Sequence, residues 1–288
     1  MLLVGRTPIA SALDSNLASK ETVVGEAMLF PQSPRVIYEK NPLEEVICQL
    51  RFPPILRIDS EIPAAFQEAI RGQYPLFTDQ ATDTLLVPKE ISKLIGKDFP
   101  IRVGNPTFNF TSADELWKVT LTRDFLALTC LKYVRWEDFK THLALPLEVF
   151  ENQYSPAFYS RIGLRYKDVI RRSKLGLEDA QWAELLKPHI AGTLGLLDFA
   201  NAVKRAVHNI VIDLDGGSSQ VRIRHGLAQE NGNGEVCYLV DSDFFTKQRM
   251  EKEYALEKLD TFNKSAGRLF RWCITDRLHK AMGPRSAK

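Results

Sequence analysis

Residues 41–54, which read Asn-Pro-Leu-Glu-Glu-Val-Ile-Cys-Gln-Leu-Arg-Phe-Pro-Pro, decide the fold class of this chain. One face of the stretch carries the apolar side chains of Val46, Cys48, Leu50 and Phe52. The other face carries the polar side chains of Glu45, Gln49 and Arg51. Such alternation is typical of a strand that buries one face and exposes the other, as strands of antiparallel sheets do. The stretch therefore predicts a one-sided antiparallel sheet, and it contains no catalytic signature.

The order of predicted elements repeats along the chain. After the first strand, a helix, strands near 106–112, 115–122 and 125–133, and a helix over 136–154 are predicted. The second half repeats this order with strands near 161–170, 206–214, 219–226 and 235–242 and a long amphipathic helix over 247–281. We expect an α+β fold with an antiparallel sheet, built as two tandem β-α-βββ-α units that resemble a helix-grip arrangement.

The predicted organisation is a flexible tail over 1–35, a first unit over 36–156 and a second unit over 157–288, with the two units able to form one continuous domain. Met28 is a candidate for the native start, because ordered patterning begins shortly after it.

Composition sets few limits on function. Of the 288 residues, 44% are hydrophobic and 26% are charged, and the formal net charge of +2 creates no global field for nucleic acid or membrane. No apolar run approaches the roughly 20 residues of a membrane span, so we expect a cytoplasmic protein without a membrane partner. The cysteines lie far apart in apolar surroundings and are expected to be buried thiols: Cys48, Cys130, Cys237 and Cys273.

Several short motifs together resemble one known family. They are Asn41-Pro42-Leu43 with Gln49-Leu50-Arg51-Phe52, Trp117 with Leu126-Ala127-Leu128, Tyr133 with Trp136-Glu137-Asp138-Phe139, Arg161-Ile162-Gly163-Leu164-Arg165-Tyr166, Asp241-Ser242-Asp243-Phe244-Phe245, and Phe270 with Thr275. The combination is similar to a sporadically distributed family of bacterial proteins of uncharacterised activity, and it covers about residues 40–281. The resemblance implies a shared fold and no known activity, with a weak hint of mobile or defence-linked loci.

Titratable side chains give weak signals for chemistry. The histidines, at positions 142, 189, 208, 225 and 279, do not share metal-ligand spacing on a helix. Four carboxylates, Asp213, Asp215, Asp241 and Asp243, could meet at one rim of the sheet to bind magnesium or to act in acid–base chemistry. Aspartate is also common where strands turn, and we favour that interpretation. We therefore expect no cofactor and no metal, and we favour a binding protein over an enzyme.

The clearest functional signal in the sequence is a group of basic side chains. Six cations are predicted on or beside the exposed faces of two strands: Arg161, Arg165, Lys167, Arg171, Arg222 and Arg224. A stripe of this kind suits anions or a nucleic-acid backbone, although exposed strands often carry arginine and lysine, and acidic neighbours could neutralise them. The favoured hypothesis is a non-catalytic binding or assembly protein, with a protein partner or self-association. Nucleic-acid binding and a small-ligand cavity under the last helix are the alternatives.

Overall fold

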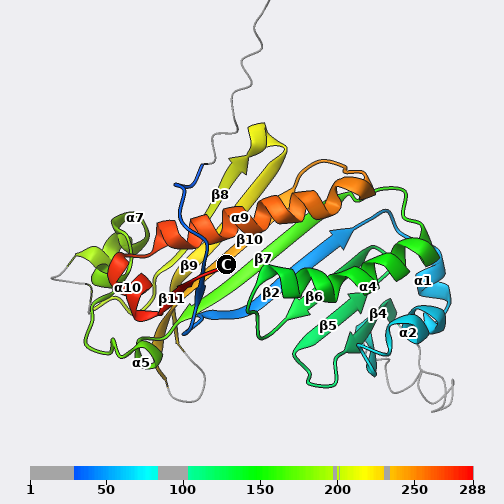
Figure 1. Ribbon diagram of the computed structural model, residues 1–288, viewed down its shortest axis with the longest axis horizontal. Coiled ribbons are helices and arrows are strands. Elements are labelled where there is room, and N and C mark those ends of the chain that lie inside the picture. Colours follow the sequence, from blue (N-terminus) through cyan, green and yellow to red (C-terminus); the bar gives the residue numbers. More distant parts are fainter. Residues whose placement is uncertain (1–28, 84–102, 197–199, 201, 230–233, 288) are drawn as a thin grey trace, which may run out of the picture.

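The computed structural model describes residues 29–83, 103–196, 200, 202–229 and 234–287. Within these ranges, nine antiparallel strands form one large sheet (Figure 1). In spatial order they are β3 (Leu76–Asp83), β4 (Val103–Thr111), β5 (Trp117–Leu121), β6 (Phe125–Cys130), β2 (Leu43–Arg51), β7 (Arg161–Ile170), β10 (Val236–Thr246), β9 (Ser219–Gln229) and β8 (Val207–Leu214). The predicted α+β class with an antiparallel sheet is confirmed.

Two long helices, α4 (Trp136–Tyr154) and α9 (Ala255–Cys273), lie over the same face of this sheet (Figure 1). Shorter helices lie at its two ends: α1 (Leu56–Ser60) and α2 (Ala64–Ile70) near α4, and α5 (Arg172–Leu175), α6 (Trp182–Leu185), α7 (Pro188–Ala191) and α10 (Asp276–Ala281) near α9. Single turns of 3-10 helix occur at Gly192–Gly195, Asp215–Gly217 and Lys252–Tyr254. We call the face opposite α4 and α9 the open face.

The two halves of the sheet meet at the pair β2–β7. In this pair Cys48 lies opposite Leu164 and Gln49 lies opposite Gly163. On each side of it three strands follow the predicted repeat, since β6, β5 and β4 extend from β2 while β10, β9 and β8 extend from β7. The first side differs from the prediction by one further strand, β3, at its outer edge. The repeated order of elements therefore produces one continuous sheet.

The opening strand behaves as its pattern predicts. Val46, Cys48, Leu50 and Phe52 are each at most 2% exposed and join the core beneath the helices. Their polar neighbours lie on the open face, where Arg51 is exposed. All four cysteines are buried free thiols, as expected.

The last helix is shorter than its pattern predicts. Instead of one helix over 247–281, α9 ends at Cys273 and α10 begins at Asp276. Between them Ile274 has extended backbone angles and forms a bridge with Leu186, while the Thr275 hydroxyl caps α10. Periodicity along the chain cannot reveal such a break, because it depends on hydrogen bonds to a distant segment.

Both ends of the described chain are fixed to each other. Strand β1 (Val36–Tyr38) pairs with β11 (Pro284–Ser286) in a separate two-stranded sheet. The predicted tail falls largely outside the described residues, and the Met28 hypothesis lies there too. From position 29 onward the chain crosses α9 (Figure 1). There the 4% exposed Phe30 contacts Trp272 at 5.6 Å between ring centroids.

Candidate functional site

The predicted basic stripe lies on the open face. Arg161, Arg165 and Lys167 project from β7, and Arg222 and Arg224 project from β9. Strand β10 lies between these strands in the sheet, so the two groups of cations are separated by its side chains. Arg171, the sixth predicted cation, directly follows β7 and forms an ion pair with Glu44 at the start of β2.

Acidic side chains of β10 neutralise the centre of this stripe. Asp243 accepts two hydrogen bonds of 2.9 Å from Arg161, and Asp241 accepts bonds of 2.7 and 2.8 Å from Arg165. Bidentate arginine–carboxylate pairs of this kind are strong and directional. On the open face, arginines of β7 thus alternate with the carboxylates of β10. This alternation of charge argues against a continuous anion-binding surface.

Gly163 provides the space that one of these arginines needs. A Cβ atom at Gly163 would lie 2.2 Å from Nη1 of Arg161, so the guanidinium lies directly over the glycine. There it donates to Gln49 at 3.3 Å and stacks over the ring of Phe245 at 4.7 Å. The glycine of the Arg-Ile-Gly-Leu-Arg-Tyr motif therefore has a structural role on the open face.

The four predicted carboxylates do not meet. Asp215 pairs with Lys258 at 2.8 Å. Asp213 accepts a hydrogen bond from Gln220 and lies 3.8 Å from the ammonium group of Lys247, while Asp241 and Asp243 bind the arginines of β7. In the part of the chain that the structure describes, no group of three or more histidine, cysteine, aspartate or glutamate side chains could hold a metal ion.

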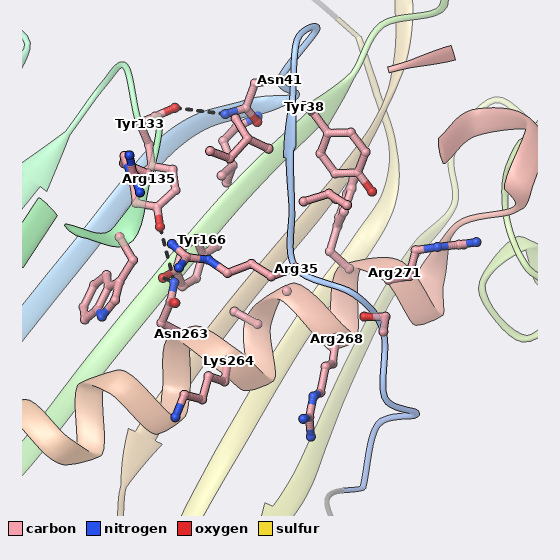
Figure 2. Close-up of a pocket in the computed structure, with 18 of the residues that line it drawn as sticks. Arg35, Tyr38, Asn41, Tyr133, Arg135, Tyr166, Asn263, Lys264, Arg268 and Arg271 are labelled. Carbon is pink, nitrogen blue, oxygen red and sulfur yellow. Dashed lines mark hydrogen bonds between the residues drawn. The ribbon is translucent and has the colours of Figure 1, made fainter. Parts of the chain in front are cut away.

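A cavity of about 380 Å³ lies on the other face of the sheet, beside α9 (Figure 2). We call it the α9 cavity. Its walls are the segment 33–41 with β1, the segment 133–136 before α4, the inner side of β7, and α9. The lining is mainly aromatic and aliphatic, and its rings are those of Tyr38, Tyr133, Trp136, Tyr166 and Phe270. Volume and lining are typical of sites that take a small organic molecule.

Hydrogen bonds fix one side of the α9 cavity. Asn263 on α9 donates to the hydroxyl oxygens of Tyr166 at 2.8 Å and of Tyr133 at 3.3 Å, and Asn41 donates to the backbone carbonyl of Tyr133 at 2.9 Å (Figure 2). Burial raises the pKa of Tyr133 to about 12 and the pKa of Tyr166 well above its ordinary value. Both tyrosines are therefore neutral at physiological pH and present rigid rings to the cavity.

Asp168 is the unusual residue of the lining. It lies on the helix-facing side of β7, directly after Ile162, Leu164 and Tyr166 in the alternation, and is 5% exposed. Among the described residues, no hydrogen bond or ion pair to its carboxyl group is found. Burial, together with the charge of Asp241, raises its pKa well above the ordinary value. An unpaired buried carboxyl group is costly, so its presence beside a cavity needs an explanation.

Cationic side chains also line the cavity, and none of them forms an ion pair with Asp168 among the described residues. Arg35 extends toward Tyr166 but is held by two bonds to Glu137 of 2.8 and 2.7 Å (Figure 2). Arg271 is paired with Asp276, and Lys264 and Arg268 point away from the tyrosines (Figure 2). The carboxyl group of Asp168 therefore has no cationic partner among the described residues of the lining.

The sequence left a cavity under the last helix as an alternative, but it identified none of the lining residues, because the predicted site residues were exposed cations. Ile162, Leu164 and Tyr166 identify the buried face of β7, and Asp168 continues that face as a carboxylate. A charged residue on a predicted buried strand face was the available signal. The roles of Tyr38 and Asn263 depend on tertiary placement, and their spacing in the chain carries no such signal.

Comparisons with known proteins give no family: no family model and no curated protein matches the chain. Across the described ranges, no helix is long and apolar enough to cross a lipid bilayer.

Proposed function

We propose that this protein binds a small organic molecule in the α9 cavity. The observation that supports the proposal most is Asp168, a buried carboxyl group that has no partner among the described residues and faces a cavity of about 380 Å³. Proteins rarely bury a carboxylate without compensation, and a ligand that supplies the missing partner offsets that cost. This corresponds to the small-ligand alternative from the sequence, and it leaves a separate assembly role open.

The lining indicates the chemical class of the ligand. Tyrosine and phenylalanine rings favour a flat, largely apolar body, which they can contact by stacking or edge-to-face packing. Asp168 favours a nitrogen that carries a proton, such as an amine, amidine or protonated heterocycle, because a cation restores the ionised form of the carboxyl group. The proposed ligand is therefore an aromatic or heteroaromatic cation with its charged nitrogen directed at Asp168.

The nucleic-acid alternative has less support. Asp241 and Asp243 lie between the predicted cationic strands and pair with Arg165 and Arg161. A phosphate backbone on this surface would have to compete with bidentate carboxylates that are already in place.

The proposal is tested by screening matched pairs of aromatic cations and their neutral isosteres by thermal shift and ligand-observed NMR. We expect cations such as benzamidine or tryptamine to bind and their uncharged counterparts to bind at least tenfold more weakly. Asp168→Asn should remove this preference, whereas Asp179→Asn, which changes an exposed aspartate, should keep it. Cations that bind equally well to the Asp168→Asn variant would contradict the proposal, as would a screen without any hits.

Two further measurements make the test specific. Gly267 lines the cavity and a Cβ there meets no atom within 4 Å, so Gly267→Leu should fill space without a clash and weaken binding. Affinity for a cation should rise with pH, because Asp168 must lose its proton to pair with the ligand and its pKa is raised in the free protein. Affinity that is independent of pH would show that the nitrogen does not contact Asp168.

A further inference from the structure

Strand β8 forms one edge of the large sheet. Its outer side has no neighbouring strand among the described residues, and its sequence Val-His-Asn-Ile-Val-Ile-Asp-Leu contains no lysine, arginine or proline. Three apolar side chains are exposed along it: Val207 by 63%, Ile210 by 40% and Val211 by 49%. Soluble proteins usually protect such an edge with lysine, proline, a bulge or a covering segment.

We infer that two copies of this chain associate by antiparallel pairing of their β8 edges. A two-fold axis perpendicular to the sheet places each strand beside itself, so one exposed edge satisfies the free backbone groups of the other. Each face of the sheet then continues into the same face of the partner. This surface differs from the α9 cavity, so the inference does not depend on the proposed ligand.

Charge complementarity favours a second copy of this chain as the partner of β8, and it favours one register of the two strands. Arg224 on β9 is exposed, has no ion pair among the described residues, and lies next to Asn209 of β8 on the open face. With the axis at Val211, Asn209 lies opposite Asp213 in the second copy. Neighbouring strands are about 4.8 Å apart, so Arg224 lies about 10 Å from the backbone of that aspartate, within joint reach of the two side chains. The two-fold axis generates this ion pair twice.

The apolar side chains agree with the same register. Val211 meets Val211 of the second copy on the open face, and Ile210 meets Ile212 on the helix side. Cross-strand pairs of β-branched residues are favourable in antiparallel sheets. Because one strand pair buries less area than a standard interface, we expect a reversible dimer that dissociates on dilution.

Sedimentation velocity of the full chain over a wide concentration range tests the inference. We expect the wild type to change from monomer to dimer with concentration, and Val211→Lys to remain a monomer because two lysines would face each other on the axis. Leu131→Lys is the matched control, since this leucine is 51% exposed on a different part of the surface, and it should dimerise like the wild type. Circular dichroism should show that all variants are folded.

Charge reversal tests the register. Arg224→Asp and Asp213→Arg alone should each weaken the dimer at least tenfold, and the double variant should restore it. A wild type that stays monomeric at every concentration would overturn the inference. So would a Val211→Lys variant that still dimerises, or a double variant that shows no restoration.

Discussion

Helices α4 and α9 each span 19 residues and cover the same face of one sheet, yet they pack in different ways. Under α4 the space is filled by rings: Phe150 lies 4.6 Å from Phe52 between centroids, and Phe139 contacts Trp117 and Trp136. Beside α9, the segment 33–41 and β7 leave a cavity. The same architectural unit therefore encloses a filled core in one half of the molecule and borders a cavity in the other.

The strands beneath the helices explain the difference. The helix-facing side of β2 and the residue after it is apolar throughout, and it ends with Phe52 against Phe150. The helix-facing side of β7 continues from Tyr166 to the carboxyl group of Asp168. A carboxyl group cannot replace an aromatic ring in core packing, so the space around it is available for another occupant.

The largest expected effect on stability concerns the filled core under α4. Phe150→Ala should lower the free energy of unfolding by about 3–5 kcal/mol, since it removes a fully buried ring and leaves a void. Phe270→Ala in the lining of the α9 cavity should cost clearly less, because that ring is only partly buried. Urea denaturation of both variants measures the difference. Equal losses would show that the two helices are packed alike.

The hydrogen-bonded wall of the cavity should give the next effect. Asn263→Ala removes the donor to the hydroxyl groups of Tyr133 and Tyr166 and should cost about 1–3 kcal/mol. On α4, Thr141→Ala removes an exposed hydroxyl bonded within its own helix and should stay within about 0.5 kcal/mol. A similar cost for both variants in chemical denaturation would contradict a structural role for Asn263.

A smaller, pH-dependent effect is expected at Asp168. Its pKa is raised in the folded protein, so the folded state retains a proton there and loses stability as pH rises above the ordinary pKa of an aspartate. Asp168→Asn should therefore stabilise the protein at pH 8 and have little effect near pH 4. Thermal unfolding across this range measures the trend. A difference that does not grow with pH would contradict it.

The smallest effect concerns the ion pair that attaches residue 35 to α4. Both side chains are about half exposed, so Arg35→Ala should cost at most about 1 kcal/mol, similar to Arg71→Ala in the exposed pair with Glu68. Arg35 lowers the pKa of Glu137 from 4.5 to about 2, so the stabilisation is present above pH 4.5 and is lost as pH falls toward 2. Denaturation in high salt should reduce the cost further. A loss above 2 kcal/mol would indicate a larger role for this pair.

Alternation and helical periodicity predict most of the fold. Both are local properties, so the strand through Cys48 and the apolar side of α9 can be read from the chain. Pairings between distant segments cannot, and these include β1 with β11 and the bridge between Leu186 and Ile274 that ends α9. The family resemblance stays a prediction, and the predicted tail lies mostly outside the described residues.

The candidate site was harder to predict for a physical reason. Sequence patterns show which face of a strand is exposed, so the arginines of β7 and β9 were correctly placed on the open face. Whether a charge is free depends on the neighbouring strand, and β10 supplies the carboxylates that pair with two of them. A cavity forms where the side chains of several packed elements leave space between them. The alternation of a single strand carries no information about that packing.

The pairing of β1 with β11 has a consequence for biosynthesis. Val36–Tyr38 is translated well before its partner Pro284–Ser286, because almost the whole sheet lies between them in the sequence. The same early segment forms one wall of the α9 cavity, and α9 itself is also made late. On the ribosome the first half of the sheet can begin to fold while this wall still lacks its support. We therefore expect the α9 cavity to be completed only after Pro284–Ser286 has left the ribosome.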